Sequence, residues 1–140
     1  MWQYIVIPLV AAAVAQLVKI VLGVIRGNAD GWRQVWSYCG MPSIHAAFTV
    51  SLCTVLLLGQ GIGPALAVAV VFTLLMLNDA LMLRRQVGDH ARVIDQLVEQ
   101  LPDNTEYKYP ILTVRIGHTF PEIIIGAVLG AVLALLLWAA

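Results

Sequence analysis

Residues 121–138 have the sequence PEIIIGAVLGAVLALLLW, and this stretch decides the fold class. It is apolar apart from one charged side chain, Glu122, near its start. A helix that crosses the hydrocarbon core of a membrane needs about 20 mostly apolar residues, because each residue advances it by about 1.5 Å. The stretch therefore predicts a transmembrane helix. Gly126 and Gly130 would let another helix approach it closely, within the chain or in a homodimer.

Three further stretches are equally apolar, and with the first they predict a bundle of about four transmembrane helices. The chain of 140 residues is 61% hydrophobic and 11% charged, and its mean hydropathy is +0.89. These values lie well outside the composition of water-soluble proteins. The further spans are expected at about residues 4–25, 42–58 and 65–83. The fold class is therefore all-α, an integral membrane bundle that forms one domain over residues 1–140.

Residues 87–101 predict a helix of another kind. Ile94, Leu97 and Leu101 recur at helical spacing, while charged residues occupy other positions of the segment. A segment of this type lies along a membrane surface with its apolar side toward the lipid. We therefore expect an amphipathic interfacial helix between the third and fourth spans.

The positively charged residues indicate an orientation. They fall mainly after the first span and between the third and fourth spans, at Arg26, Arg33, Arg84, Arg85, Arg92, Lys108 and Arg115. The positive-inside rule places these segments in the cytoplasm and both termini outside, and we expect the inner membrane of a bacterium. The formal net charge is zero, which gives no reason to expect nucleic acid as a partner.

Two ionisable residues fall inside the predicted spans. An ionisable side chain near the centre of a membrane helix costs on the order of 2.5 to 3.5 kcal/mol, so Lys19 and Asp79 are candidates for a functional site. Both lie toward the same predicted membrane face. The alternative is a structural ion pair between them, or a lysine that reaches to the interface.

Two predicted helix starts lie at that same face and carry reactive side chains. Residues 40–45 place the hydroxyl of Ser43 and the imidazole of His45 at the start of the second span, and residues 117–122 place His118 and Glu122 at the start of the fourth. Helix N-termini bind anions. Together with the cations, two imidazoles and a carboxylate suit phosphoryl transfer better than metal binding. The two cysteines match no zinc or redox spacing.

These residues carry a resemblance to a known family. The segments Lys19–Arg26, Pro42–His45 and Gly117–Glu122 resemble, in order, the three motifs of the type 2 phosphatidic acid phosphatase and vanadium haloperoxidase superfamily. The chain is most similar to its short divergent branch, the acid phosphatase/vanadium-dependent haloperoxidase-related membrane proteins. In that branch Asp79–Arg85 also matches a characteristic box. The resemblance covers nearly the whole chain.

The resemblance implies a phosphatase or phosphotransferase that acts on a lipid phosphate monoester without a metal or another cofactor. His118 would attack phosphorus, Glu122 would hold its imidazole, and His45 would protonate the leaving alkoxide. The remaining site residues would bind the phosphoryl oxygens and are Lys19, Arg26, Ser43, Gly40 and one of Arg84 and Arg85.

Several of these residues also suit simpler structural roles. Ser43 could act as the N-cap of the second span, and Thr119 with Glu122 forms a capping-box sequence in which the carboxylate bonds to the Thr119 N–H. Arg84 and Arg85 could be charges that stop membrane insertion. For the whole chain, the alternatives are a catalytically inactive protein that binds anionic lipid headgroups or a membrane partner, and haloperoxidase chemistry with bound vanadate.

Overall fold

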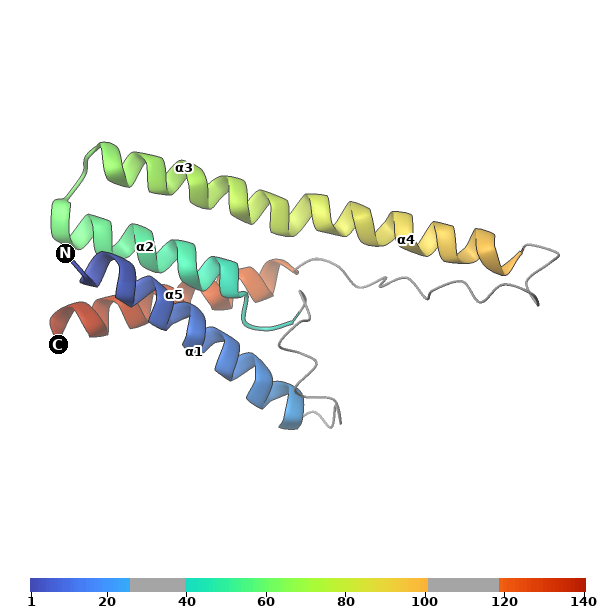
Figure 1. Ribbon diagram of the computed structural model, residues 1–140, viewed down its shortest axis with the longest axis horizontal. Helices are drawn as coiled ribbons and strands as arrows, with labels where there is room; N and C mark the ends of the chain where they lie inside the picture. The colour runs from blue at the N-terminus through green and yellow to red at the C-terminus, as the bar shows by residue number, and fades with distance from the viewer. Residues whose placement is uncertain (26–39, 101–118) are drawn as a thin grey trace.

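The computed structural model describes residues 1–25, 40–100 and 119–140, and the regular structure in these ranges is helical. Figure 1 shows the arrangement. The elements are α1 (Gln3–Ile25), α2 (Ile44–Gln60), α3 (Pro64–Asn78), the π-helix η2 (Asp79–Leu83), α4 (Arg84–Glu99) and α5 (Phe120–Ala139). The predicted all-α fold class is confirmed.

Three helices in the described part of the chain are long and apolar enough to cross a membrane. They are Gln3–Ile25, the continuous helix Pro64–Val98, and Phe120–Ala139. The second predicted span, α2, is shorter, with 17 residues, which at about 1.5 Å each give a length close to the core thickness of about 30 Å. The helix count therefore fits the prediction of about four spans.

The amphipathic segment is helical, but it is continuous with α3 instead of forming a separate surface helix. The helix runs for 35 residues from Pro64 to Val98 and passes through the π-helix η2. Arginine is a good helix former, so Arg84 and Arg85 end the apolar stretch without ending the helix. Figure 1 shows α4 extending beyond the bundle that the other helices form.

Small residues pack inside the bundle, and large apolar residues face outward. The central helix α2 packs most extensively against α5. A Cβ atom added at Gly126 would overlap the backbone of Ser43, and one added at Gly130 would overlap the backbone of Ala47. The two helix backbones are therefore in contact, which only glycine at these α5 positions allows. The predicted close approach at these two glycines occurs within one chain.

Helix α1 presents a similar stripe to the interior. Apart from Pro8, its buried residues recur every four positions at Ile7, Ala11, Ala15, Lys19 and Gly23. Between spans there is little hydrophobic driving force, because lipid tails are as apolar as leucine, so close packing of small side chains holds such bundles together. Lys19 is the exception on this stripe and identifies where the bundle interior becomes polar.

The two ends of the bundle differ in character. At one end, Tyr4 of α1 packs against Trp138 of α5 with ring centroids 5.7 Å apart, and both contact the space left by Gly59 of α2. Figure 1 shows both termini and the α2–α3 connection at this end. The end of α1, the starts of α2 and α5, and η2 lie toward the other end, where the predicted site residues fall.

Candidate functional site

Ser43 caps α2 and links it to α5. Its backbone is extended, with φ −73° and ψ 118°, and its Oγ accepts a hydrogen bond of 3.4 Å from the Ala46 N–H. The Ser43 N–H donates to the carbonyl oxygen of Glu122 at 3.0 Å. Ser43 is fully buried. The N-cap interpretation is therefore confirmed, and the same residue joins the starts of both motif-bearing helices.

Lys19 and Gly40 lie against each other. The Lys19 side chain is only 3% exposed, which is unusual for a charged residue within a membrane span. A Cβ atom added at Gly40 would lie 3.2 Å from Cε of Lys19. Gly40 has φ +121°, a backbone conformation that residues other than glycine rarely adopt. The first and second motifs of the resemblance therefore meet at this point.

Glu122 occupies the first turn of α5 and forms the capping bond. The Thr119 N–H donates to its Oε2 at 2.9 Å, and the residue is half-buried. This confirms the capping interpretation. The amide that Glu122 holds belongs to the peptide bond between His118 and Thr119, so the carboxylate fixes the backbone directly next to the predicted nucleophile.

His45 is the second residue of α2, half-buried, with its Nδ1 atom buried. Its carbonyl oxygen accepts a hydrogen bond of 2.8 Å from Thr49 Oγ1. The carbonyl of Thr49 in turn accepts from Thr73 Oγ1 of α3 at 3.5 Å, and Thr73 also lies 3.2 Å from Cys53 Sγ. Sequence reasoning missed this polar contact between α2 and α3. The sequence signal for such a contact is a hydroxyl side chain inside an apolar span, because these side chains form hydrogen bonds between helices.

The π-helix brings the Asp79 segment to the same end. Ala80 is 1% exposed and packs with Ala46 of α2 and Ile123 of α5. Asp79, the first residue of η2, is half-buried. π-helical turns are rare in proteins, and many of those that occur lie at functional sites. The turn covers Asp79–Leu83, which is the first part of the Asp79–Arg85 box that the resemblance identified.

Other predicted site residues lie outside the described part of the chain. Arg26 and His118 belong to the undescribed ranges, and for Arg84 and Arg85 the structure describes the helical backbone at the start of α4 but not the side chains. Their roles, and the pairing of Lys19 with Asp79, stay predictions. Among the described residues, no three His, Cys, Asp or Glu side chains form a group that could hold a metal ion.

The described residues at this end of the bundle carry charge of both signs: Lys19 and the two helix starts are positive, and Glu122 and Asp79 are carboxylates. The α2 and α5 N-termini are joined by the Ser43–Glu122 hydrogen bond, and each carries the partial positive charge of a helix start. The buried ammonium-bearing side chain of Lys19 lies next to Gly40, three residues before Ser43. A phosphoryl group near this end would meet both kinds of positive charge.

The apolar helices and the comparison with known proteins define an integral membrane protein. Residues 2–133 match the family model described as the Divergent PAP2 family, so the chain belongs to that family. It is also 32% identical over 141 residues to an uncharacterized membrane protein, YuiD, of Bacillus subtilis (strain 168). That alignment covers 92% of this chain and 89% of YuiD. No solved structure matches the chain. The family resemblance drawn from the three motifs is confirmed.

Proposed function

We propose that this protein is a lipid phosphatase or phosphotransferase that acts on a lipid phosphate monoester through a phosphohistidine intermediate on His118. The observation that carries the proposal is the contact between Lys19 and Gly40 beside the capped and α5-bonded Ser43. The family resemblance assigns Lys19, Gly40 and Ser43 to phosphate binding, and the hydrogen bond from Ser43 joins them to Glu122, which it assigns to the third motif. Membership of the Divergent PAP2 family supports the same chemistry.

In the first step, an imidazole nitrogen of His118 attacks phosphorus. An N–P bond forms while the P–O bond to the lipid alcohol breaks, and the leaving alkoxide takes a proton from protonated His45. Lys19 and the two helix N-termini stabilise the charge that develops on the phosphoryl oxygens. Glu122 keeps the backbone next to His118 in place through its bond to the Thr119 N–H.

In the second step, water attacks phosphorus and the N–P bond breaks. His45, now neutral, takes a proton from the water, so inorganic phosphate leaves and both histidines return to their starting states. If an alcohol replaces water, the same step is phosphotransfer. No step in this scheme is assigned to a metal ion.

The proposal is tested by measuring phosphate release from purified protein in detergent without added metal. The substrates are a polyprenyl phosphate, phosphatidate and phosphatidylglycerol phosphate, and the comparison is wild type against His118→Ala. We expect the wild type to release phosphate from at least one of them and His118→Ala to release none. A wild-type protein that stays folded and releases no phosphate from any of the three would overturn the proposal.

A second candidate function is binding without catalysis, to anionic headgroups or to a membrane partner. The capping bond favours it, because Glu122 is already engaged in stabilising a helix start. Headgroup binding uses the Lys19 charge and the helix N-termini, so it survives His118→Ala. Vesicle binding that depends on anionic lipid and is unchanged in His118→Ala, together with no phosphate release, would favour this function.

For the location, we propose a bacterial inner membrane with the site on the cytoplasmic side and both termini outside. The Lys and Arg residues outside the spans fall in the sequence after the first span and between the third and fourth spans, and no Lys or Arg occurs near either terminus. The relative YuiD is a bacterial membrane protein. A homodimer, if one forms, uses a surface other than the Gly126–Gly130 stripe, because that stripe is covered by α2.

A further inference from the structure

Two adjacent arginines, Arg84 and Arg85, follow the π-helix, and the family resemblance gives only one of them a place in the site. Successive residues of a helix are turned by about 100° from each other, so the two positions lie on different sides of it. The structure describes their backbone as the start of α4. The described residues before and after the pair determine which side each position occupies.

Three residues define the side of α3 and η2 that faces the bundle. The buried residues of α3 are Ala69 and Thr73, and Ala80 of η2 is 1% exposed. They are separated by four and then seven residues, so they lie on one side of the helix. The contact of Thr73 with Cys53 holds this side against α2.

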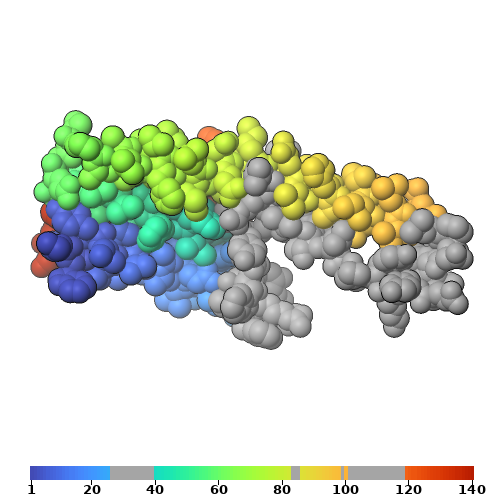
Figure 2. Space-filling model, turned by 45° about the horizontal axis from the view of Figure 1, so that its top comes forward, coloured from blue at the N-terminus to red at the C-terminus, as the bar shows by residue number. Residues whose placement is uncertain are grey.

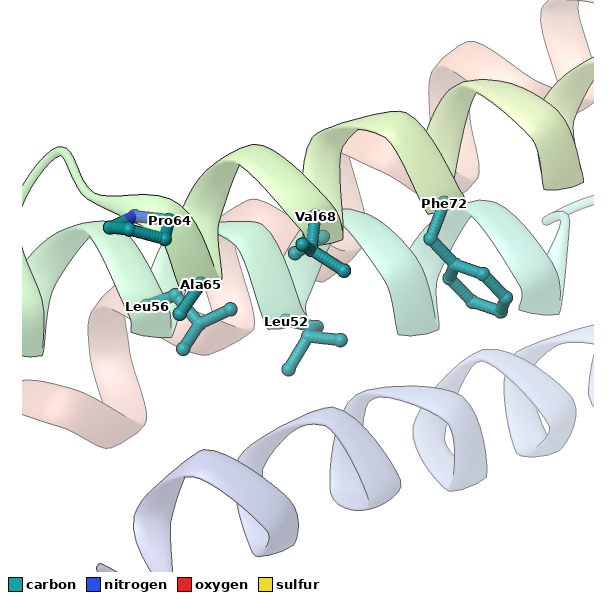
Figure 3. A pocket seen from close by; sticks show the side chains of 7 residues that line it. Leu52, Leu56, Pro64, Ala65, Val68 and Phe72 are labelled. Carbon is teal, nitrogen blue, oxygen red and sulfur yellow. The ribbon is translucent and has the colours of Figure 1, made fainter.

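The helix carries this rotation on toward the arginines. Figure 2 shows α3 (green) and α4 (yellow to orange) in line along the molecule, and Figure 3 shows Val68 and Phe72 of α3 beside Leu52 of α2 at the edge of the α2–α3 contact. A π-turn takes up more residues than an α-helical turn, since its hydrogen bonds join residues five apart. The side occupied by Ala80 is therefore reached again at position 84 or 85.

The exposure of the α4 residues favours position 84. Gly88 and Ala91 are buried and Asp95 is half-buried, and they follow Arg84 by four, seven and eleven residues. Residues at these spacings lie on one side of a helix. Position 84 therefore continues the less exposed side of α4.

Arg85 lies on a different side of α4, which is exposed and charged. Asp89 and Arg92 follow it by four and seven residues, and their side chains are 58% and 61% exposed. They form an ion pair with each other at 3.6 Å. Position 85 therefore belongs to a side of the helix that is directed away from the rest of the molecule.

Position 84 is also level with the two helix starts of the site. Ala80 packs with Ala46 of α2 and Ile123 of α5, and both of these helices run antiparallel to α3 (Figure 1). Four residues beyond Ala80 advance the helix by at most roughly 6 Å. The N-caps of α2 and α5 lie three and four residues before these contact residues. Position 84 therefore reaches the level at which the proposed function places the phosphoryl group.

We infer that Arg84 is the arginine of the site and that Arg85 is a charge on the outer side of α4. The inference rests on the proposed function for the identity of the ligand. A guanidinium binds two phosphoryl oxygens at once in a planar geometry, which the ammonium of Lys19 does not. Arg84 therefore adds bidentate stabilisation of the phosphoryl oxygens in the transition state.

The test compares two matched variants of the full chain in detergent, Arg84→Gln and Arg85→Gln. Each removes one positive charge from the same turn of the same helix, and glutamine keeps the helix propensity of arginine. We expect Arg84→Gln to lower kcat/KM for phosphate release by roughly 100-fold, as for the loss of one donor to a transition-state oxyanion. We expect Arg85→Gln to keep the wild-type value.

Thermal unfolding gives a readout that needs no turnover. A ligand that binds only the folded protein raises its melting temperature, and inorganic phosphate serves as the probe. We expect phosphate to stabilise the wild type and Arg85→Gln but not Arg84→Gln. The melting temperatures without phosphate show whether each variant is folded. If Arg84→Gln does not fold, Arg84→Lys replaces it, because lysine keeps the charge and lacks the planar fork, so the same losses in weaker form are expected.

The outcomes separate this inference from the proposed function. Equal losses in the two glutamine variants, or a larger loss in Arg85→Gln, would overturn the inference and leave the proposed function standing. If the wild type releases no phosphate from any substrate, the proposed function fails, and stabilisation by inorganic phosphate still shows which arginine holds the anion. A wild type that neither releases phosphate nor is stabilised by it would overturn both.

Discussion

At the scale of single residues, Glu122 combines two tasks that substitution can separate. Its carboxylate accepts a hydrogen bond from the Thr119 N–H, and the family resemblance predicts that it also holds the imidazole of His118. Glutamine can form the same capping bond but carries no charge. We expect Glu122→Gln to keep the thermal stability of the wild type and to lose phosphate release by about tenfold or more, because a neutral amide does not stabilise a charged imidazole.

Glu122→Ala serves as the comparison for that variant. It removes the cap as well as the charge, so we expect it to lose activity and also about 0.5 to 2 kcal/mol of stability. Thermal unfolding and phosphate release measured on the same preparations distinguish the two tasks. Full activity in Glu122→Gln would show that Glu122 only caps α5.

Gly40 offers a second prediction, because its position next to Lys19 can be separated from its backbone conformation. An alanine at φ +121° is strained by roughly 1 to 2 kcal/mol, and its Cβ would also press on Lys19 Cε. We expect Gly40→Ala to be less stable than wild type and to release phosphate more slowly, because the Lys19 side chain must shift. Thermal unfolding and phosphate release in detergent measure the two effects.

Gly61→Ala is the matched control for Gly40→Ala. Gly61 has φ +72°, and a Cβ atom there would have no neighbour within 4 Å. It lies at the opposite end of the bundle, after α2. The control is expected to lose similar stability and to keep wild-type activity per folded molecule. Equal loss of activity in both variants would mean that strain alone, and not the displacement of Lys19, affects the site.

At the scale of elements, the α2–α5 contact sets the distance between the two motif-bearing helices. Gly130→Leu would place a side chain where the backbone of Ala47 lies, so the helices must separate. We expect a loss of stability of about 1 to 3 kcal/mol or more, as for other overpacked sites, together with reduced phosphate release. Val128→Leu, on the lipid-facing side of α5, should leave both thermal unfolding and activity unchanged. An unaltered melting temperature in Gly130→Leu would contradict the helix contact.

The helices themselves could be predicted from the sequence, but the end of α3 could not. Hydropathy predicts where a chain leaves the lipid, and it predicts such a point near Arg84. Whether the helix also ends there depends on backbone hydrogen bonds, which charged residues with good helix propensity do not interrupt. The residue pattern did not predict the π-helix over Asp79–Leu83, within which Ala80 packs against α2 and α5.

The candidate site, too, could be predicted from the sequence only in part. Lys19, Gly40 and Ser43 could be identified because buried charge, a helix start and a motif coincide in the sequence. The contact of Thr73 with Thr49 and Cys53 could not, because it depends on how α3 is rotated against α2. A pattern of residues along one helix fixes which side is apolar, but the pairing between two apolar helices is decided by shape in three dimensions.

At the scale of the whole molecule, both termini lie at the end of the bundle opposite the candidate site (Figure 1). A single measurement of one terminus therefore fixes the side on which the site operates. The concentration of Lys and Arg in the segments after the first span and between the third and fourth spans predicts termini outside the cytoplasm. We expect alkaline phosphatase fused to the C-terminus to be active and green fluorescent protein fused there to be dark. The reverse result would place the site on the outer side.

The close contact of α2 with α5 also limits how this chain can change during evolution. At positions 126 and 130 the backbone of the neighbouring helix occupies the space of any side chain larger than hydrogen, so substitutions there are removed by selection. The valines, leucines and isoleucines on the outside of the bundle are exposed, and fluid lipid would accept any of them. Related chains should therefore diverge quickly over their outer surface while the few smallest interior residues persist, which is the reverse of the usual pattern in a water-soluble protein with a core of large side chains.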